Sequence, residues 1–118
     1  MICAFPGNET LGERLRAELG AEALGLEWRR FPDGESYVRF TRPFQDHLTI
    51  VCTLNDPDTK ALALLYAART ARELGAASVG LVAPYLGYMR QDRRFRDGEA
   101  VTSVHFAALI SEIGRAHV

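Results

Sequence analysis

The sequence has little lysine, little cysteine and no long apolar run. Lys60 is the only lysine among 14 basic residues, and codon usage explains this arginine bias at most positions, with phosphate binding as the functional alternative. Cys3 and Cys52 each lie in an apolar strand-like run, which argues against a disulfide framework or a zinc site. No segment is apolar over the length of a membrane span, and no charged leader precedes an apolar signal core. We therefore expect a cytoplasmic protein without a membrane partner.

Neither acidic nor basic residues predominate in the sequence. The 118 residues carry a formal net charge of -1, so no global field attracts nucleic acid or an anionic membrane. We expect no nucleic-acid partner, and any anion must bind at a local site. With 47% hydrophobic and 25% charged residues, the chain has the composition of one globular domain with a single core.

Apolar runs and segments of helical periodicity alternate along the chain. Strand-like runs at residues 1–5, 47–54 and 78–84 alternate with helical segments at 7–20, 55–75 and 98–114. Because the strands are almost wholly apolar, they predict an α/β fold with a mostly parallel sheet flanked by helices on both faces. Two short strand-like runs flank the turn signal "PDGE", which predicts a β-hairpin excursion around residues 27–40 with an exposed tip.

Helix-end signals refine these boundaries. Thr10 and Glu13 have the spacing of a capping box, and Gly20 is suited to end the first helix. Pro57 suits the first turn of the second helix, and Gly75 suits its end.

The segment "PYLGYMRQDRRF", residues 84–95, begins where a predicted strand ends. Ligands of open α/β sheets bind beyond the carboxyl ends of the strands. Residues 90–99 hold four arginines and three carboxylates, a net charge of +1, which is too small for a nucleic-acid patch. From spacing alone the favoured interpretation is a solvated loop whose charges pair with one another, and the alternative is that Arg90 clamps a phosphate. His47 and His105 have no ligand or carboxylate at useful spacing, so we expect them to be surface or core residues.

Three motifs together carry a family resemblance. They are "GN" at residues 7–8, "RFPDGESYVRF" at 30–40 and "PYLGYMRQDRRF" at 84–95. In this order and spacing they resemble the N-terminal domain of ribose-phosphate pyrophosphokinase, over roughly residues 1–111. The resemblance implies a phosphoribosyltransferase-like fold and an active form that is a homo-oligomer.

The resemblance also implies an activity and a set of ATP contacts. The family uses Mg²⁺ and transfers a pyrophosphoryl group from ATP to ribose 5-phosphate, which gives phosphoribosyl pyrophosphate and AMP. By its motifs, Phe31 would stack on adenine, and the turn Asp33, Gly34 and Glu35 would reach the nucleotide from a neighbouring subunit. Arg90 and Gln91 would contact ATP within their own subunit.

Two departures from the family pattern shape the remaining expectations. The segment "RFRDGEAV", residues 94–101, diverges from the family and favours a competing hypothesis, a non-catalytic regulatory or scaffolding homologue. Retention of the ATP-contacting residues favours the enzyme. The chain ends before the family's magnesium-binding histidine and its catalytic loops, so we expect no catalytic or metal-binding residue here and no activity from this chain alone.

The last residues form a separate expectation. "EIGRAHV", residues 112–118, is what one reading frame of a common sequencing adapter encodes, so we predict a non-native tail after an incomplete domain at residues 1–111. The alternative is a native helix end followed by a lost strand.

Overall fold

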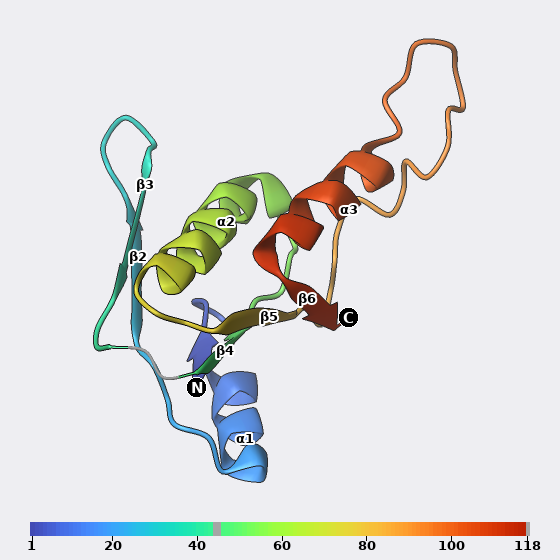
Figure 1. The fold of residues 1–118 in the computed structure, drawn as a ribbon. Helices are drawn as coiled ribbons and strands as arrows, with labels where there is room; N and C mark the ends of the chain where they lie inside the picture. The colour runs from blue at the N-terminus through green and yellow to red at the C-terminus, as the bar shows by residue number, and fades with distance from the viewer. Residues whose placement is uncertain (44–45, 118) are drawn as a thin grey trace.

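The fold is a parallel sheet between two layers of helix. The computed structural model describes residues 1–43 and 46–117. Four parallel strands lie in the order β1-β4-β5-β6, and they are β1 (Ile2–Ala4), β4 (His47–Val51), β5 (Ser78–Val82) and β6 (Arg115–His117). One face of the sheet carries α1 (Glu9–Leu19), and the other carries α2 (Pro57–Glu73) and α3 (Thr102–Ile113) (Figure 1). The predicted α/β architecture is confirmed.

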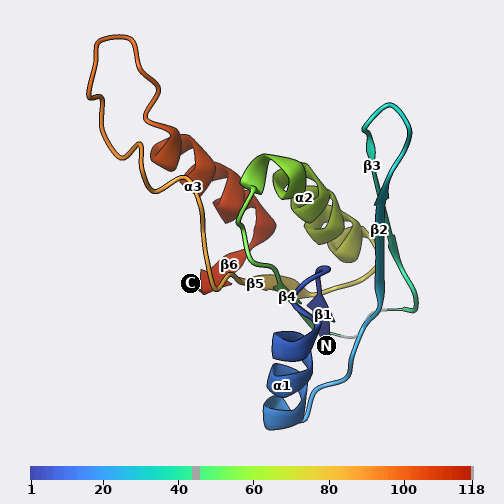
Figure 2. The same ribbon diagram turned by 180° about the vertical axis from the view of Figure 1, so that it is seen from behind.

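A β-hairpin stands apart from this sheet. It consists of β2 (Leu26–Arg30) and β3 (Ser36–Phe40), which pair antiparallel. The hairpin rises beside α2 and projects past it, as the views from front and back both show (Figures 1 and 2). It is anchored to the rest of the domain where the Trp28 ring packs on Phe5, with ring centroids 5.4 Å apart. The excursion predicted around residues 27–40 is confirmed.

The core forms because apolar side chains of the strands pack against apolar side chains of the helices. On β4 and β5, residues such as Leu48, Ile50 and Leu81 are fully buried. They belong to one cluster with the buried positions of α2, which are Ala63, Leu64, Ala67, Ala68 and Ala71. Four of these five are alanine, and such short side chains allow a helix to pack close to the sheet.

The direction of the chain reverses between β1 and β4. After β1 and α1, residues 22–24 run along the free edge of β1, where the Ile2 amide donates to Glu22 (2.8 Å) and the Leu24 amide donates to Ile2 (2.8 Å). The chain then crosses to β4 on the opposite side of β1, and β5 and β6 continue away from it. The carboxyl ends of β1 and β4 therefore flank a topological switch point, the usual place for a ligand in open α/β sheets.

The predicted helix ends were partly right. α1 begins at Glu9 with Asn8 as its N-cap, so the capping box of Thr10 and Glu13 was wrong. Glu13 instead forms an ion pair with Arg16 (2.6 Å) one turn later. Gly20 ends α1 in the left-handed conformation (φ 59°), and Pro57 opens α2, both as predicted.

Part of the predicted foreign tail lies inside this fold. Ile113 is fully buried, and the guanidinium of Arg72 donates to the carbonyl oxygens of Glu112 and Ile113 at the end of α3. Gly114 has φ 147°, and a Cβ there would overlap the carbonyl oxygen of Val79. Residues 115–117 then pair with β5, and residue 118 lies outside the described residues. The foreign origin of residues 112–118 stays a prediction.

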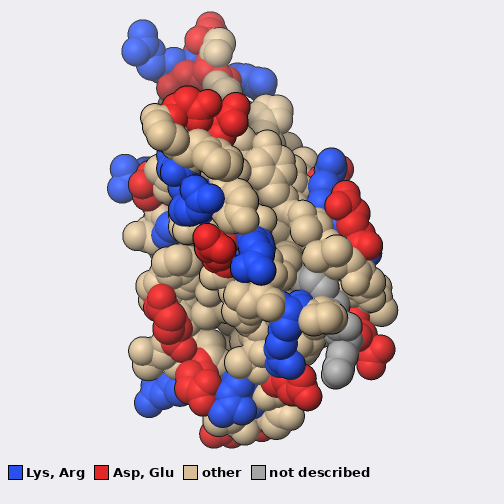
Figure 3. Space-filling model, turned by 90° about the vertical axis from the view of Figure 1, so that its left-hand side faces the viewer, with Lys and Arg blue, Asp and Glu red and all other residues tan. Residues whose placement is uncertain are grey.

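Two surface properties bear on partners. None of the helices in the described part of the chain has the length and apolar character needed to cross a membrane. On the face that carries the hairpin, acidic and basic side chains are interspersed, without a continuous patch of one sign (Figure 3).

The two buried thiols give a pH-dependent prediction for stability. Burial raises the pKa of Cys3 to about 12, with nearby Cys52 adding to the effect, and burial raises the pKa of Cys52 to about 11. The thiols of the unfolded chain have the ordinary pKa of 9.0, so between that pH and the folded pKa values the unfolded state loses protons first. Stability should be unaffected by the thiols below about pH 8 and should fall by about 1 kcal/mol per thiol near pH 10.

The measurement is urea unfolding at several pH values. The double variant Cys3→Ala, Cys52→Ala removes both thiols and should show a shallower decline above about pH 9. An identical decline in the variant and the unmodified chain would contradict the prediction.

Candidate functional site

The loop after β5 is held in a fixed conformation. The Leu54 amide donates to the Tyr85 carbonyl (2.7 Å), which ties the loop after β4 to the loop after β5. Gly87 has φ 79°, and a Cβ there would lie 2.6 Å from the Leu54 carbonyl oxygen. Tyr88 is a non-glycine residue with positive φ (55°), and its ring packs on Phe106 with centroids 4.8 Å apart. These contacts fix the direction in which the following residues leave the sheet.

A hollow lies beyond the carboxyl end of β5, beside the start of α2. We call it the strand-end hollow, and its volume is about 520 Å³. This volume is in the range of small-molecule sites. Its lining residues are Asp56, Pro57, Asp58, Tyr85, Tyr88, Met89, Arg90, Gln91 and Thr102.

Arg90 is the cation of the strand-end hollow. It is exposed and makes no ion pair or hydrogen bond with any residue in the described part of the chain. Gln91 is half-buried and fixed, because its side-chain amide donates to the Arg93 backbone carbonyl (3.1 Å) and its backbone carbonyl accepts from the Ser103 backbone amide (3.3 Å). The guanidinium is therefore available for an external anion, and a planar fork of N–H donors suits phosphate.

The projecting loop beyond Arg90 is organised by backbone contacts. The Glu99 carboxylate accepts from the amides of Phe95 (3.0 Å) and Arg96 (2.6 Å), and the Arg94 guanidinium donates to the Glu99 carbonyl (3.0 Å). No ion pair joins two side chains within residues 90–99, all of which the structure describes. The interpretation that these charges pair with one another was wrong. A carboxylate that accepts two backbone N–H groups gains fixed partners that a mobile arginine does not offer.

The hairpin tip lines a second hollow, against α2. We call it the hairpin hollow, and its volume is about 550 Å³. Its lining residues are Arg30, Asp33, Gly34, Glu35, Ser36, Asp58, Thr59, Leu62 and Tyr66. The Arg30 guanidinium donates to the Thr59 carbonyl (2.6 Å) and joins the hairpin to the first turn of α2. At the tip, Asp33 accepts from the Glu35 amide (3.1 Å), and Gly34 has the positive φ (94°) that this turn requires.

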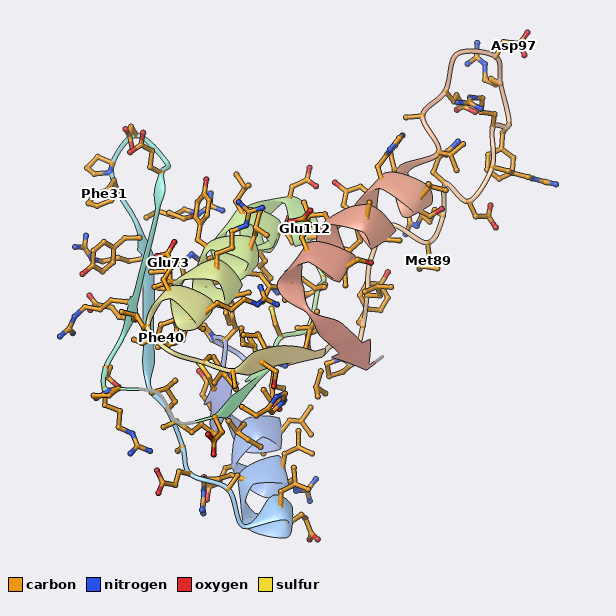
Figure 4. The ribbon with its side chains drawn as sticks, in the orientation of Figure 1. Phe31, Phe40, Glu73, Met89, Asp97 and Glu112 are labelled. Carbon is orange, nitrogen blue, oxygen red and sulfur yellow. The ribbon has the colours of Figure 1, made fainter. Side chains whose placement is uncertain are left out.

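Phe31 lies outside both hollows. Its side chain is on the outer side of the hairpin, away from α2 (Figure 4). The ring is 39% exposed, meets Tyr37 edge to face (5.8 Å) and lies 5.2 Å from the Arg29 guanidinium. An exposed ring supported from one side can stack on a second aromatic group.

The structure thus divides the predicted site residues into separate groups. Asp33, Gly34 and Glu35 line the hairpin hollow, and Arg90 and Gln91 line the strand-end hollow. The hairpin tip and the projecting loop lie at opposite ends of the molecule in both views (Figures 1 and 2).

Sequence reasoning missed Asp58, which lines both hollows from the first turn of α2. The available signal was its position at the start of the helix that follows a parallel strand.

The architecture and the strand-end hollow together define an α/β domain with a hollow of small-molecule size beyond the carboxyl end of its parallel sheet. The chain belongs to a family described as the N-terminal domain of ribose phosphate pyrophosphokinase, whose model matches residues 1–114. The match continues beyond residue 111, where the domain was predicted to end.

Individual relatives agree with this family. The chain is 36% identical over 115 residues to a ribose-phosphate pyrophosphokinase of Methanobrevibacter smithii, covering 97% of this chain and 39% of the relative. It is 40% identical over 112 residues to one from Saccharolobus solfataricus, covering 92% of this chain and 38% of the relative. The fold is similar to the phosphoribosylpyrophosphate synthetase structure from Mycobacterium smegmatis, with a TM-score of 0.80, 20% identity and coverage of 98% of this chain and 39% of that one. The chain therefore spans about two fifths of the length of the proteins it matches.

Proposed function

We propose that this chain is the ATP-binding N-terminal half of a ribose-phosphate diphosphokinase, a transferase of nucleotide biosynthesis. The reaction moves the pyrophosphoryl group of ATP to the anomeric hydroxyl of ribose 5-phosphate and releases AMP. The observation that carries the proposal is the unpaired Arg90 guanidinium in the strand-end hollow, on a loop that the Gly87 and Tyr88 contacts hold in place. A cytoplasmic location is part of the proposal.

Within the strand-end hollow, Arg90 would bind a phosphate of ATP and Gln91 would supply a polar contact beside it. Asp56 and Asp58 line the same hollow, so a bare polyphosphate would meet two carboxylates as well as one guanidinium. Pairing of the nucleotide with Mg²⁺ would reduce that repulsion. The described residues contain no group of three or more His, Cys, Asp or Glu side chains that could hold a metal ion.

The hairpin residues would act on a neighbouring copy. Within one chain the hairpin tip and the projecting loop that follows Arg90 lie on opposite sides of the molecule (Figures 1 and 2), and Phe31 faces outward (Figure 4). A homo-oligomer in which the tip reaches the strand-end hollow of a second subunit would bring Phe31, Asp33, Gly34 and Glu35 to the nucleotide. An exposed aromatic residue on a projecting turn suits such a role, because stacking needs a free ring face.

Binding of MgATP to the purified chain tests the proposal. We expect two-dimensional NMR to show saturable shifts at the amides of Arg90 and Gln91, because they line the proposed phosphate site. Shifts at Asp33 and Glu35 that depend on protein concentration would add the contribution of the hairpin. Absence of any saturable shift would favour the non-catalytic regulatory or scaffolding homologue, for which the divergent residues 94–101 are the present argument.

We expect the chain alone to give no turnover of ATP and ribose 5-phosphate to AMP. The relatives carry the activity on a chain of which this one matches 39%, and phosphoryl transfer depends on groups that position and neutralise the reacting phosphates. The measurement is AMP release by protein freed of host enzymes, with the full-length relative as the positive control. AMP formation that copurifies with the chain would overturn this expectation.

A further inference from the structure

A third hollow lies at the switch point between β1 and β4. We call it the switch-point hollow, and its volume is about 350 Å³. Its lining residues are Pro6, Gly7, Asn8, Thr53, Asn55 and Lys60. None of them lines the strand-end hollow or the hairpin hollow, so it is a separate hollow from the proposed ATP site.

Its walls are joined by a buried polar network. Asn8 is 8% exposed and is the buried polar residue of the described chain. Its amide donates to the Thr53 hydroxyl oxygen (2.7 Å), and its side-chain carbonyl accepts from the Thr53 backbone amide (3.0 Å). These two bonds lock the loop after β1 to the loop after β4. Because the Thr53 hydroxyl accepts from Asn8, its own proton is available to donate to a ligand.

Lys60 supplies a positive charge to this network. Its ammonium donates to the Thr53 carbonyl (2.9 Å) and to the Asn55 side-chain oxygen (2.6 Å). An ammonium has three N–H donors, so one remains. Lys60 is half-buried, and within residues 1–43 and 46–117 no carboxylate forms an ion pair with it. A partly desolvated cation with neutral partners favours an anion as its next neighbour.

An acidic side chain close to this hollow, Glu9, is bonded elsewhere. The Glu9 carboxylate accepts from the Gly7 amide (2.9 Å), and Glu9 lines a separate hollow beneath α1. The Gly7 amide is thus already used. The donors left facing the switch-point hollow are the Lys60 ammonium, the Thr53 hydroxyl and the Asn55 side-chain amide.

We propose that the switch-point hollow binds a phosphate group, either as inorganic phosphate or as a small phosphomonoester. Lys60 provides the charge, while Thr53 and Asn55 provide neutral donors, and Asn8 positions Thr53 without touching the ligand. The hollow has room for a phosphate and a small attached group. The competing role for Lys60 is to brace the loop between β4 and α2 with no ligand.

The test is an NMR titration of the purified chain at constant ionic strength, with potassium chloride replaced by inorganic phosphate in one arm and by ribose 5-phosphate in the other. We expect saturable shifts at the amides of Gly7, Asn8, Thr53 and Asn55. Lys60→Gln should weaken this binding by about tenfold, the loss expected for one charged hydrogen bond. Arg90→Ala, in the strand-end hollow, should leave these shifts and their affinity unchanged.

Each outcome decides the proposal. Tighter binding of the sugar phosphate or of inorganic phosphate identifies the source of the phosphate group, and either result supports the site. Shifts confined to Arg90 and Gln91, or no saturable shift in either arm, would overturn it. Unchanged affinity in a folded Lys60→Gln chain would show that Lys60 only braces the loop, and if this variant fails to fold, the map of shifts in the unmodified chain still decides.

Discussion

Replacement of Arg90 by alanine is expected to weaken MgATP binding by about ten- to a hundredfold, the effect of one hydrogen-bonded charge. The guanidinium is exposed and has no partner among the described residues, so its removal breaks no contact within the chain. The free energy of unfolding should therefore stay the same while affinity falls. Isothermal titration calorimetry of the variant and the unmodified chain measures the difference, and urea unfolding checks the stability.

Two further variants give this prediction its controls. Arg96→Ala removes an arginine from the same loop but outside the strand-end hollow, and it should cost less than about 1 kcal/mol of binding free energy. Arg90→Lys should recover only part of the affinity, because an ammonium does not reproduce a bidentate fork. Equal small losses at positions 90 and 96 would remove Arg90 from the site.

Replacement of Gly87 by alanine is expected to lower the free energy of unfolding by about 2 to 5 kcal/mol. The new Cβ would lie 2.6 Å from the Leu54 carbonyl oxygen and 3.3 Å from the Pro57 ring, and the backbone has φ 79°. Neither neighbour can move without disturbing the Leu54 to Tyr85 hydrogen bond or the start of α2. The measurement is urea unfolding followed by circular dichroism.

The matched control is Gly98→Ala in the projecting loop. Gly98 has nearly the same conformation (φ 84°), but a Cβ there would meet nothing within 4 Å. Gly98→Ala should lower the free energy of unfolding only by the cost of placing an alanine in a left-handed backbone conformation, about 1 to 2 kcal/mol. The excess loss at position 87 measures the collision with Leu54. If the free energy of unfolding falls by the same amount in both variants, the close approach of residue 87 to Leu54 does not contribute to stability.

Much of the fold follows from local sequence pattern. Continuous apolar runs around Leu48 and Leu81 predicted buried parallel strands, and burial of these residues confirms it. The hairpin followed from "PDGE", because Gly34 meets the demand of the turn for positive φ. Pro57 and Gly20 marked helix ends through their own backbone preferences. In each case the information lies within a few residues of the element that it specifies.

The unpredicted features depend on contacts between distant segments. The capping box failed because α1 begins one residue before Thr10, where the chain leaves the buried Asn8 that is bonded to Thr53. Asp58 lines two hollows because α2 lies between the hairpin and the loop after β5. The pairing of loop charges was wrong because Glu99 satisfies backbone amides of the loop. The spacing of residues in the sequence does not predict any of these contacts.

The projecting loop has a consequence for how such a domain changes over time. Residues 92–98 are all exposed, and the loop extends beyond α3 away from the core (Figure 1). Substitutions there face little selection for stability, since no buried neighbour restricts their size or polarity. Residues 92–98 can therefore change in sequence without a compensating change in the rest of the molecule.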